Sequence, residues 1–131
     1  MTATRRLRKA LGLPIALLVL AAVVYVGLLF RWPVEKTLAY WLIDGQRLGV
    51  VVLDAPDLAC DVARVDETSD AVRIHAQCQE RVIPVPQPAM VQQYVFEVAL
   101  HEPLGARTVF DGLGNLAELC NVPAPDCFPT K

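Results

Sequence analysis

Four cysteines are the residues of this 131-residue chain whose type and number point most directly to a chemistry. An even number of cysteines is typical of a protein that forms disulfides in an oxidising compartment. We therefore predict that all four have a structural role as half-cystines. They are Cys60, Cys78, Cys120 and Cys127.

Four cysteines allow three connectivities, and we favour the one that pairs Cys60 with Cys78 and Cys120 with Cys127. Residues 60–65 and 71–78 have the composition of two strands, and the polar residues 66–70 between them suit a hairpin. If Val62 lies opposite Ala76, then Cys60 lies opposite Cys78. The six residues between Cys120 and Cys127 include two prolines, which suit a compact loop.

The two histidines offer a competing reading, a zinc or copper site formed by His75 and His101 with Cys60 and Cys78. On a strand, however, His75 and Cys78 are an odd number of residues apart and project to opposite faces. Disulfide formation would also remove the sulfur ligands. We therefore expect no metal, and a solvated position for each histidine on the polar face of its strand.

Catalytic motifs are missing from the sequence. The single serine, Ser69, lies in the predicted hairpin loop without a Gly-x-Ser-x-Gly frame. Phosphate-binding, dinucleotide-binding and haem-attachment motifs are absent, and so is the Cys-x-x-Cys pattern of thiol oxidoreductases. We predict a protein that is not an enzyme and has no cofactor.

The elements that position these residues begin with an apolar run of twenty residues, Leu11–Phe30, that carries no charge. Such a run, at about 1.5 Å per residue, matches the roughly 30 Å of a bilayer's hydrocarbon core. Four basic residues precede it within 1–10, so the positive-inside rule leaves the N-terminus in the cytoplasm. We expect a transmembrane signal-anchor over 11–31, with Pro14 in its first turn. The alternative is a cleaved signal peptide, cut before Ala22.

Residues 32–49 match a juxtamembrane amphipathic helix. Val34, Leu38, Trp41 and Leu42 share one helical face, which would lie either on the membrane surface or on the protein's own sheet. Aromatic and basic side chains favour the membrane interface. The predicted interface anchors are Arg31, Trp32, Tyr40 and Trp41.

Residues 50–131 have the pattern of a small exported β domain. Besides the hairpin, we expect strands over 50–53, 94–101 and 107–110, and a short helix over 115–120. The proline-rich segment 83–88 is either an extended connection or a docking peptide. The predicted fold class is α+β: one N-terminal transmembrane helix, then a small disulfide-stapled antiparallel β domain with one or two short helices.

Charge and layout restrict the function. The net charge is −2, and residues from Trp32 onward include seven basic and fourteen acidic side chains, which argues against nucleic-acid binding. We expect an accessory or structural subunit that contacts the lipid bilayer and larger membrane proteins. The alternative is a tethered binding module for a small ligand or an envelope polymer. Nine arginines against three lysines suggest a bacterium, and hence its inner membrane with the C-terminal domain in the periplasm.

Overall fold

The computed structural model describes residues 3–56, 58–81 and 90–129, and it divides into two compact units. The first unit comprises Met1–Trp32 with Arg81–Val85, and the second comprises Pro33–Glu80 with Pro86–Lys131. The expected connection over 83–88 lies outside the described residues.

Helix α1 (Ala3–Leu29) is the main element of the first unit. Within the described part of the chain, no helix is both long and apolar enough to cross a membrane, so the predicted transmembrane span is wrong. Pro14 lies inside α1 and not in its first turn, because the helix already begins at Ala3.

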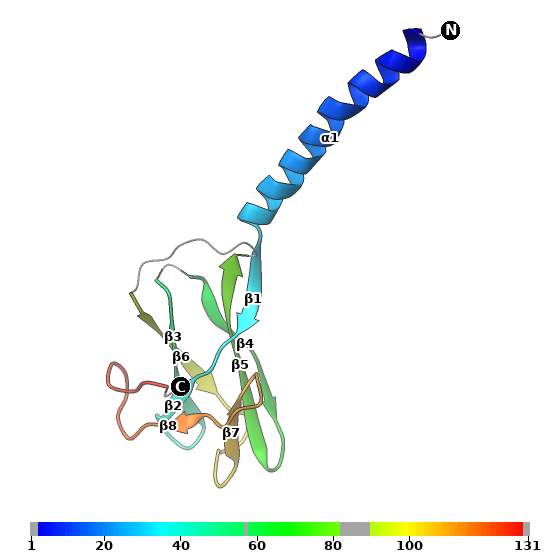
Figure 1. The fold of residues 1–131 in the computed structure, drawn as a ribbon. Coiled ribbons are helices and arrows are strands. Elements are labelled where there is room, and N and C mark those ends of the chain that lie inside the picture. Colours follow the sequence, from blue (N-terminus) through cyan, green and yellow to red (C-terminus); the bar gives the residue numbers. More distant parts are fainter. Residues whose placement is uncertain (1–2, 57, 82–89, 130–131) are drawn as a thin grey trace. The chain divides into compact units, whose positions relative to one another are not determined.

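The second unit contains two four-stranded sheets, except for the strand-end residues Arg31, Trp32 and Arg81, which belong to the first unit. The chain is therefore mostly β and not the predicted α+β arrangement (Figure 1). One sheet has the order β1-β5-β4, with β7 also paired to β5, and we name it sheet A. Its strands are β1 (Arg31–Glu35), β4 (Cys60–Glu67), β5 (Ala71–Arg81) and β7 (Thr108–Asp111). The other, sheet B, has the order β6-β3-β2-β8. Its strands are β2 (Ala39–Leu42), β3 (Arg47–Asp54), β6 (Gln92–Ala99) and β8 (Glu118–Leu119).

The amphipathic helix predicted over 32–49 is not formed, because this segment is divided among β1, β2 and the start of β3. β2 and β3 make an antiparallel hairpin that pairs Ala39 with Val51 and Leu42 with Leu48. The connecting turn contains Asp44-Gly45, a dipeptide typical of hairpin turns. Asp44 Oδ1 accepts hydrogen bonds from the backbone N–H groups of Gln46 and Arg47, both at 2.9 Å. These bonds lower the pKa of Asp44, with a contribution from the Arg47 guanidinium.

The main core lies between the inner faces of the two sheets. From sheet A, the predicted alternating face of β5 is buried, and from sheet B, alternate residues of β3 meet it. These residues are Val72, Ile74, Ala76 and Cys78 of β5 and Leu48, Val50 and Val52 of β3. Each fully buried valine, leucine or isoleucine among them contributes roughly 1.5–3 kcal/mol through burial.

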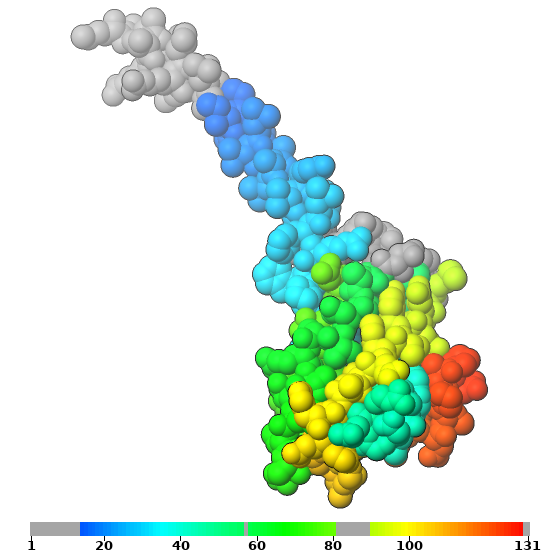
Figure 2. All heavy atoms as spheres, turned by 180° about the vertical axis from the view of Figure 1, so that it is seen from behind, coloured from blue at the N-terminus to red at the C-terminus, as the bar shows by residue number. Residues whose placement is uncertain are grey.

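A second, smaller core lies on the outer face of sheet B. Ala39 and Val51 are buried there under Cys127, and Trp41 packs beside them. The C-terminal segment therefore covers this face, and Gln93 of β6 donates a hydrogen bond of 2.8 Å to the carbonyl of Pro125. Figure 2 shows the red C-terminal segment beside the yellow-green residues of β6.

The short helix expected over 115–120 is also absent. Glu118–Leu119 instead forms β8, which runs parallel to β2, and Leu116 makes a single bridge to Phe110. Asn115 does not cap a helix: its backbone N–H donates to Asp111 Oδ1 at 2.8 Å and closes a turn after β7. Pairing with sheet B decides the conformation of this segment.

Both predicted disulfides are confirmed. Cys60 is paired with Cys78 at facing positions of β4 and β5, in the predicted register with Val62 opposite Ala76. Cys120 is bonded to Cys127 across seven positions of sequence. In the chain-entropy model, loops of these lengths contribute about 3 and about 2 kcal/mol.

Candidate functional site

His75 lies on the outer face of sheet A and, with Asp111, is one of the two buried polar or charged residues in the described part of the chain. The face was predicted correctly, but the expected solvation was wrong, since His75 is only 8% exposed. Glu35 of β1 and Gly112, which follows β7, lie against the ring. A Cβ atom at Gly112 would come within 2.8 Å of His75 Nδ1 and would overlap the Glu35 carboxylate. Glycine therefore permits the turn after β7 to close over the histidine.

Both nitrogens of His75 have polar partners. Nδ1 is 3.0 Å from Glu35 Oε1, and Nε2 is 3.0 Å from Asp66 Oδ2. The guanidinium of Arg64 also approaches Nε2, at 3.1 Å. Gln77 donates to the same Glu35 oxygen at 2.9 Å, so the group extends along β5. We call these residues, Glu35, Arg64, Asp66, His75 and Gln77, the His75 cluster.

A β-bulge in β4 places two of these partners. The register of β4 against β5 shifts between Val62 and Arg64, after which Arg64 lies opposite His75. Beyond the shift, Arg64 and Asp66 face outward while Val65 packs against the main core. The sequence gives no clear signal for this shift, which is why these partners were not predicted.

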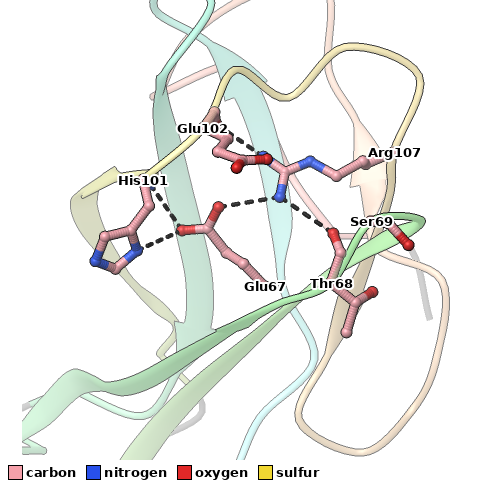
Figure 3. Close-up of a pocket in the computed structure, with 6 residues that line it drawn as sticks. All are labelled: Glu67, Thr68, Ser69, His101, Glu102 and Arg107. Carbon is pink, nitrogen blue, oxygen red and sulfur yellow. Dashed lines mark hydrogen bonds and ion pairs between the residues drawn. The ribbon is translucent and has the colours of Figure 1, made fainter.

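Figure 3 shows a second polar group, at the turn that joins β4 to β5. It surrounds a pocket of about 440 Å³. The residues come from the end of β4, from the β4–β5 turn and from the loop between β6 and β7. They are Glu67, Thr68, Ser69, His101, Glu102 and Arg107.

Glu67 is the centre of this pocket. Its Oε1 accepts hydrogen bonds from the backbone N–H of His101 at 2.8 Å and from the ring Nδ1 of His101 at 2.9 Å. Its Oε2 accepts one from Arg107 Nη1 at 3.0 Å. Partial burial raises the pKa of Glu67, but the bonds from His101, Arg107 and the Glu102 backbone outweigh it and lower the pKa to about 2. Glu67 is therefore a stable anion at neutral pH.

Arg107 is occupied by the protein itself. Its guanidinium donates to Glu67 and to the carbonyl oxygens of Thr68, Glu102, Pro103 and Leu104, at 2.7–3.4 Å. The side chain is only 8% exposed. The group therefore ties the β6–β7 loop to the β4–β5 turn, and Arg107 keeps no free donor direction for a ligand.

The pocket does not assemble a nucleophile with a base. His101 is bound through Nδ1 to Glu67, an arrangement that leaves Nε2 as a potential base, and its side chain is 94% exposed. Ser69, however, lies on the opposite side of Arg107 from His101, and its hydroxyl points away (Figure 3). A serine hydrolase needs the hydroxyl within hydrogen-bond reach of the histidine.

A smaller pocket of about 320 Å³ lies beside the turn after β7. The buried carboxylate of Asp111 lies at this pocket, and Asn115 satisfies it with a backbone bond of 2.8 Å and a side-chain bond of 3.3 Å. Thr37, Leu38 and Leu116 complete much of the lining. Asp111 therefore shapes the turn that covers His75.

The four predicted interface anchors occupy different environments. In the first unit, Arg31 is exposed, and the exposed ring of Trp32 lies 5.3 Å from that of Phe30. In the second unit, Tyr40 is buried in the main core, where burial raises its pKa, and Trp41 lies over Gly49 on the outer face of sheet B. Neighbouring strand residues point to opposite faces, so Tyr40 and Trp41 do not share a surface.

Within the described residues, no group of three or more His, Cys, Asp or Glu side chains is arranged to hold a metal ion. His75 and Cys78 project to opposite faces of β5, as the strand geometry predicts, and Cys78 is bonded to Cys60. Comparisons with protein-family models, curated proteins and solved structures give no match to this chain.

Proposed function

We propose that this chain is a non-enzymatic accessory or structural subunit of a protein complex, and that α1 contacts its partner. The observation that carries the proposal is the exposure of α1. Eleven large apolar side chains of α1 between Ile15 and Leu29 are each 42–70% exposed, and so is Phe30 directly after the helix. A helix that is apolar on all sides is normally covered in its working state.

The energetics support a stable association. Covering one large apolar side chain contributes roughly 1.5–3 kcal/mol, so burying several of them along one helix favours association. Ala16, Ala21, Ala22 and Gly27 intersperse this surface with small side chains, which let a second helix approach closely. A helical segment of a larger protein is the partner that this surface fits best.

The C-terminal segment offers a further apolar surface on the second unit. Five large apolar side chains between residues 113 and 128 are 47–70% exposed, although the disulfide holds the segment on sheet B. They are Leu113, Leu116, Leu119, Val122 and Phe128. Their exposure favours a role in contacts with other proteins.

The disulfides support a location outside the cytoplasm for the second unit. All four cysteines are bonded, and such bonds persist in oxidising compartments such as the bacterial periplasm. This location is part of our proposal.

Photo-crosslinking of the full-length chain in its native cells tests the proposed contact. A photoreactive amino acid replaces Leu18 or Val23 of α1 in two variants, and Asp61, an exposed residue of β4, in a matched control. We expect both α1 positions to capture the same protein, and the Asp61 position not to capture it. Affinity purification in mild detergent should recover that protein in a fixed ratio.

Two outcomes would contradict the proposal. Crosslinks to lipid alone, or recovery of the chain as a monomer without a fixed partner, would exclude the accessory role.

A ligand-binding module is the second candidate, and the pocket at Glu67 favours it. Its exposed His101 and Glu102 could contact a polar ligand. The internal bonds of Arg107 speak against it, because a ligand would have to compete with five protein acceptors. Recovery as a monomer in the crosslinking experiment would make this the preferred function.

A further inference from the structure

The two ring nitrogens of His75 have partners of different kinds: Nδ1 faces an acceptor, whereas Nε2 faces both an acceptor and a donor. Nδ1 of His75 faces one acceptor, Glu35 Oε1, at 3.0 Å. An ionised carboxylate can only accept hydrogen bonds, so with Glu35 ionised this contact favours the tautomer that carries a proton on Nδ1. Gln77 donates to the same oxygen and keeps it in place. The Nδ1 side of the ring is therefore fixed.

The Nε2 side has two partners of opposite kind. Asp66 Oδ2, at 3.0 Å, can only accept, and Arg64 Nη2, at 3.1 Å, can only donate. A protonated Nε2 bonds to Asp66, and an unprotonated Nε2 accepts from Arg64. Each protonation state of the buried ring thus has a partner within hydrogen-bond distance.

The elements packed around the ring bring three charged side chains and one glycine close to it. β1 contributes Glu35, and β4 contributes Arg64 and Asp66, which are themselves paired at 3.0 Å. Arg73 of β5 is exposed and lies opposite Asp66 in the register. The turn after β7 contributes Gly112, while the carboxylate of nearby Asp111 is bonded to Asn115. The groups that exchange are therefore all on β4.

We propose that His75 is a proton-operated switch in which Nε2 exchanges Asp66 for Arg64 when it loses its proton, while Nδ1 stays bonded to Glu35. Asp66 and Arg64 have side chains that are 46% and 64% exposed, so the exchange alters the charge pattern presented on the outer face of sheet A. β1 keeps its bond to β5 in both states. The device makes this surface sensitive to pH without unfolding the sheet.

Nitrogen-detected NMR of the full-length protein tests the switch directly. The ¹⁵N shifts of both histidine rings are followed between pH 4 and pH 8, with the exposed His101 as an internal reference. At the alkaline end we expect His75 to carry its proton on Nδ1 and a bare Nε2. On acidification, Nε2 gains a proton, while Nδ1 keeps the proton that it already carries.

Two nearly isosteric variants identify the partners. Asp66→Asn removes the anion that favours protonated Nε2, so the midpoint of the His75 titration should move to lower pH by about 0.5 unit or more. Arg64→Gln removes the cation and should move it to higher pH by a similar amount. Asp61→Asn, on the same strand, should leave the midpoint in place.

A merely structural role would lower stability in these variants without moving the midpoint in opposite directions. A bare Nδ1 at alkaline pH, or a His75 ring that does not titrate, would also overturn the proposal. The tautomer measurement uses the unmodified chain and holds even if a variant fails to fold.

Discussion

Glu67 illustrates how a single residue organises a site. Its carboxylate receives bonds from the backbone and ring of His101 and from Arg107, which joins two loops that are distant in sequence. Charge-assisted hydrogen bonds of this kind contribute about 1.5–3 kcal/mol each when they are shielded from water. Because His101 is exposed, its ring contributes less than Arg107 does.

We predict that Glu67→Gln lowers the free energy of unfolding at pH 7 by about 1–3 kcal/mol. The folded-state pKa is lowered to about 2, from an ordinary value of 4.5. The stability from the ionised carboxylate is therefore present above about pH 4.5 and is lost as the pH falls toward 2. Urea denaturation should show that the free energy of unfolding of the variant differs from that of the native chain at pH 7, and that this difference is smaller at pH 2.5. Glu102→Gln, at an exposed carboxylate of the same pocket, serves as the control and should change stability by less than about 0.5 kcal/mol.

At the scale of the elements, the β2–β3 hairpin shows how one glycine determines packing. Gly49 of β3 lies opposite Trp41 of β2, and a Cβ atom at Gly49 would overlap the indole ring. The absence of a side chain lets Trp41 lie flat on the strand and pack beside the second core. Strand glycines often mark such a close approach.

We predict that Gly49→Ala displaces the Trp41 ring and lowers the free energy of unfolding by about 1–3 kcal/mol. In a Trp32→Phe background, where Trp41 is the remaining tryptophan, its fluorescence should shift toward longer wavelengths. Gly45→Ala is the matched control, because a Cβ atom there would meet nothing within 4 Å. Equal effects of the two substitutions would contradict the packing argument.

At the scale of the whole second unit, one cation joins the two sheets. Lys36 lies between β1 and β2, and its Nζ contacts Asp54 at the end of β3, at 2.8 Å, and Glu80 near the end of β5. Its backbone N–H donates to Ala76 of β5 at 2.9 Å. Burial lowers the pKa of Lys36, but the bonds to Asp54 and Glu80 outweigh it and raise the pKa above 10.5.

We predict that Lys36→Gln lowers the free energy of unfolding by about 1–3 kcal/mol at pH 7, since it leaves two carboxylates without their cation. The stability from a raised lysine pKa is fully present below about pH 10.5 and is lost as the pH rises through the folded-state value. In thermal melts, the native chain should therefore be more stable than the variant below about pH 10.5, and this difference in stability should disappear as the pH rises through the folded-state pKa of Lys36. Arg73→Gln, which removes an exposed cation of sheet A, should have little effect.

Periodicity and cysteine spacing predicted correctly those features of the fold that depend on a local sequence pattern. The alternating face of β5, the β4–β5 hairpin and its register with Cys60 opposite Cys78 were all deduced from spacing and are confirmed. The pairing of Cys120 with Cys127 followed from loop length. These features depend on residues that are neighbours in the sequence or related by a short turn.

Only the tertiary structure decided the rest, because the contacts involved join distant segments. Residues 32–49 have apolar spacings that suit a helix, but pairing with β3 and β5 makes them strands. His75 was placed on a polar face, yet Glu35 from forty positions away and the Gly112 turn remove it from water. A one-dimensional pattern gives the face of a strand, whereas burial depends on what folds over that face.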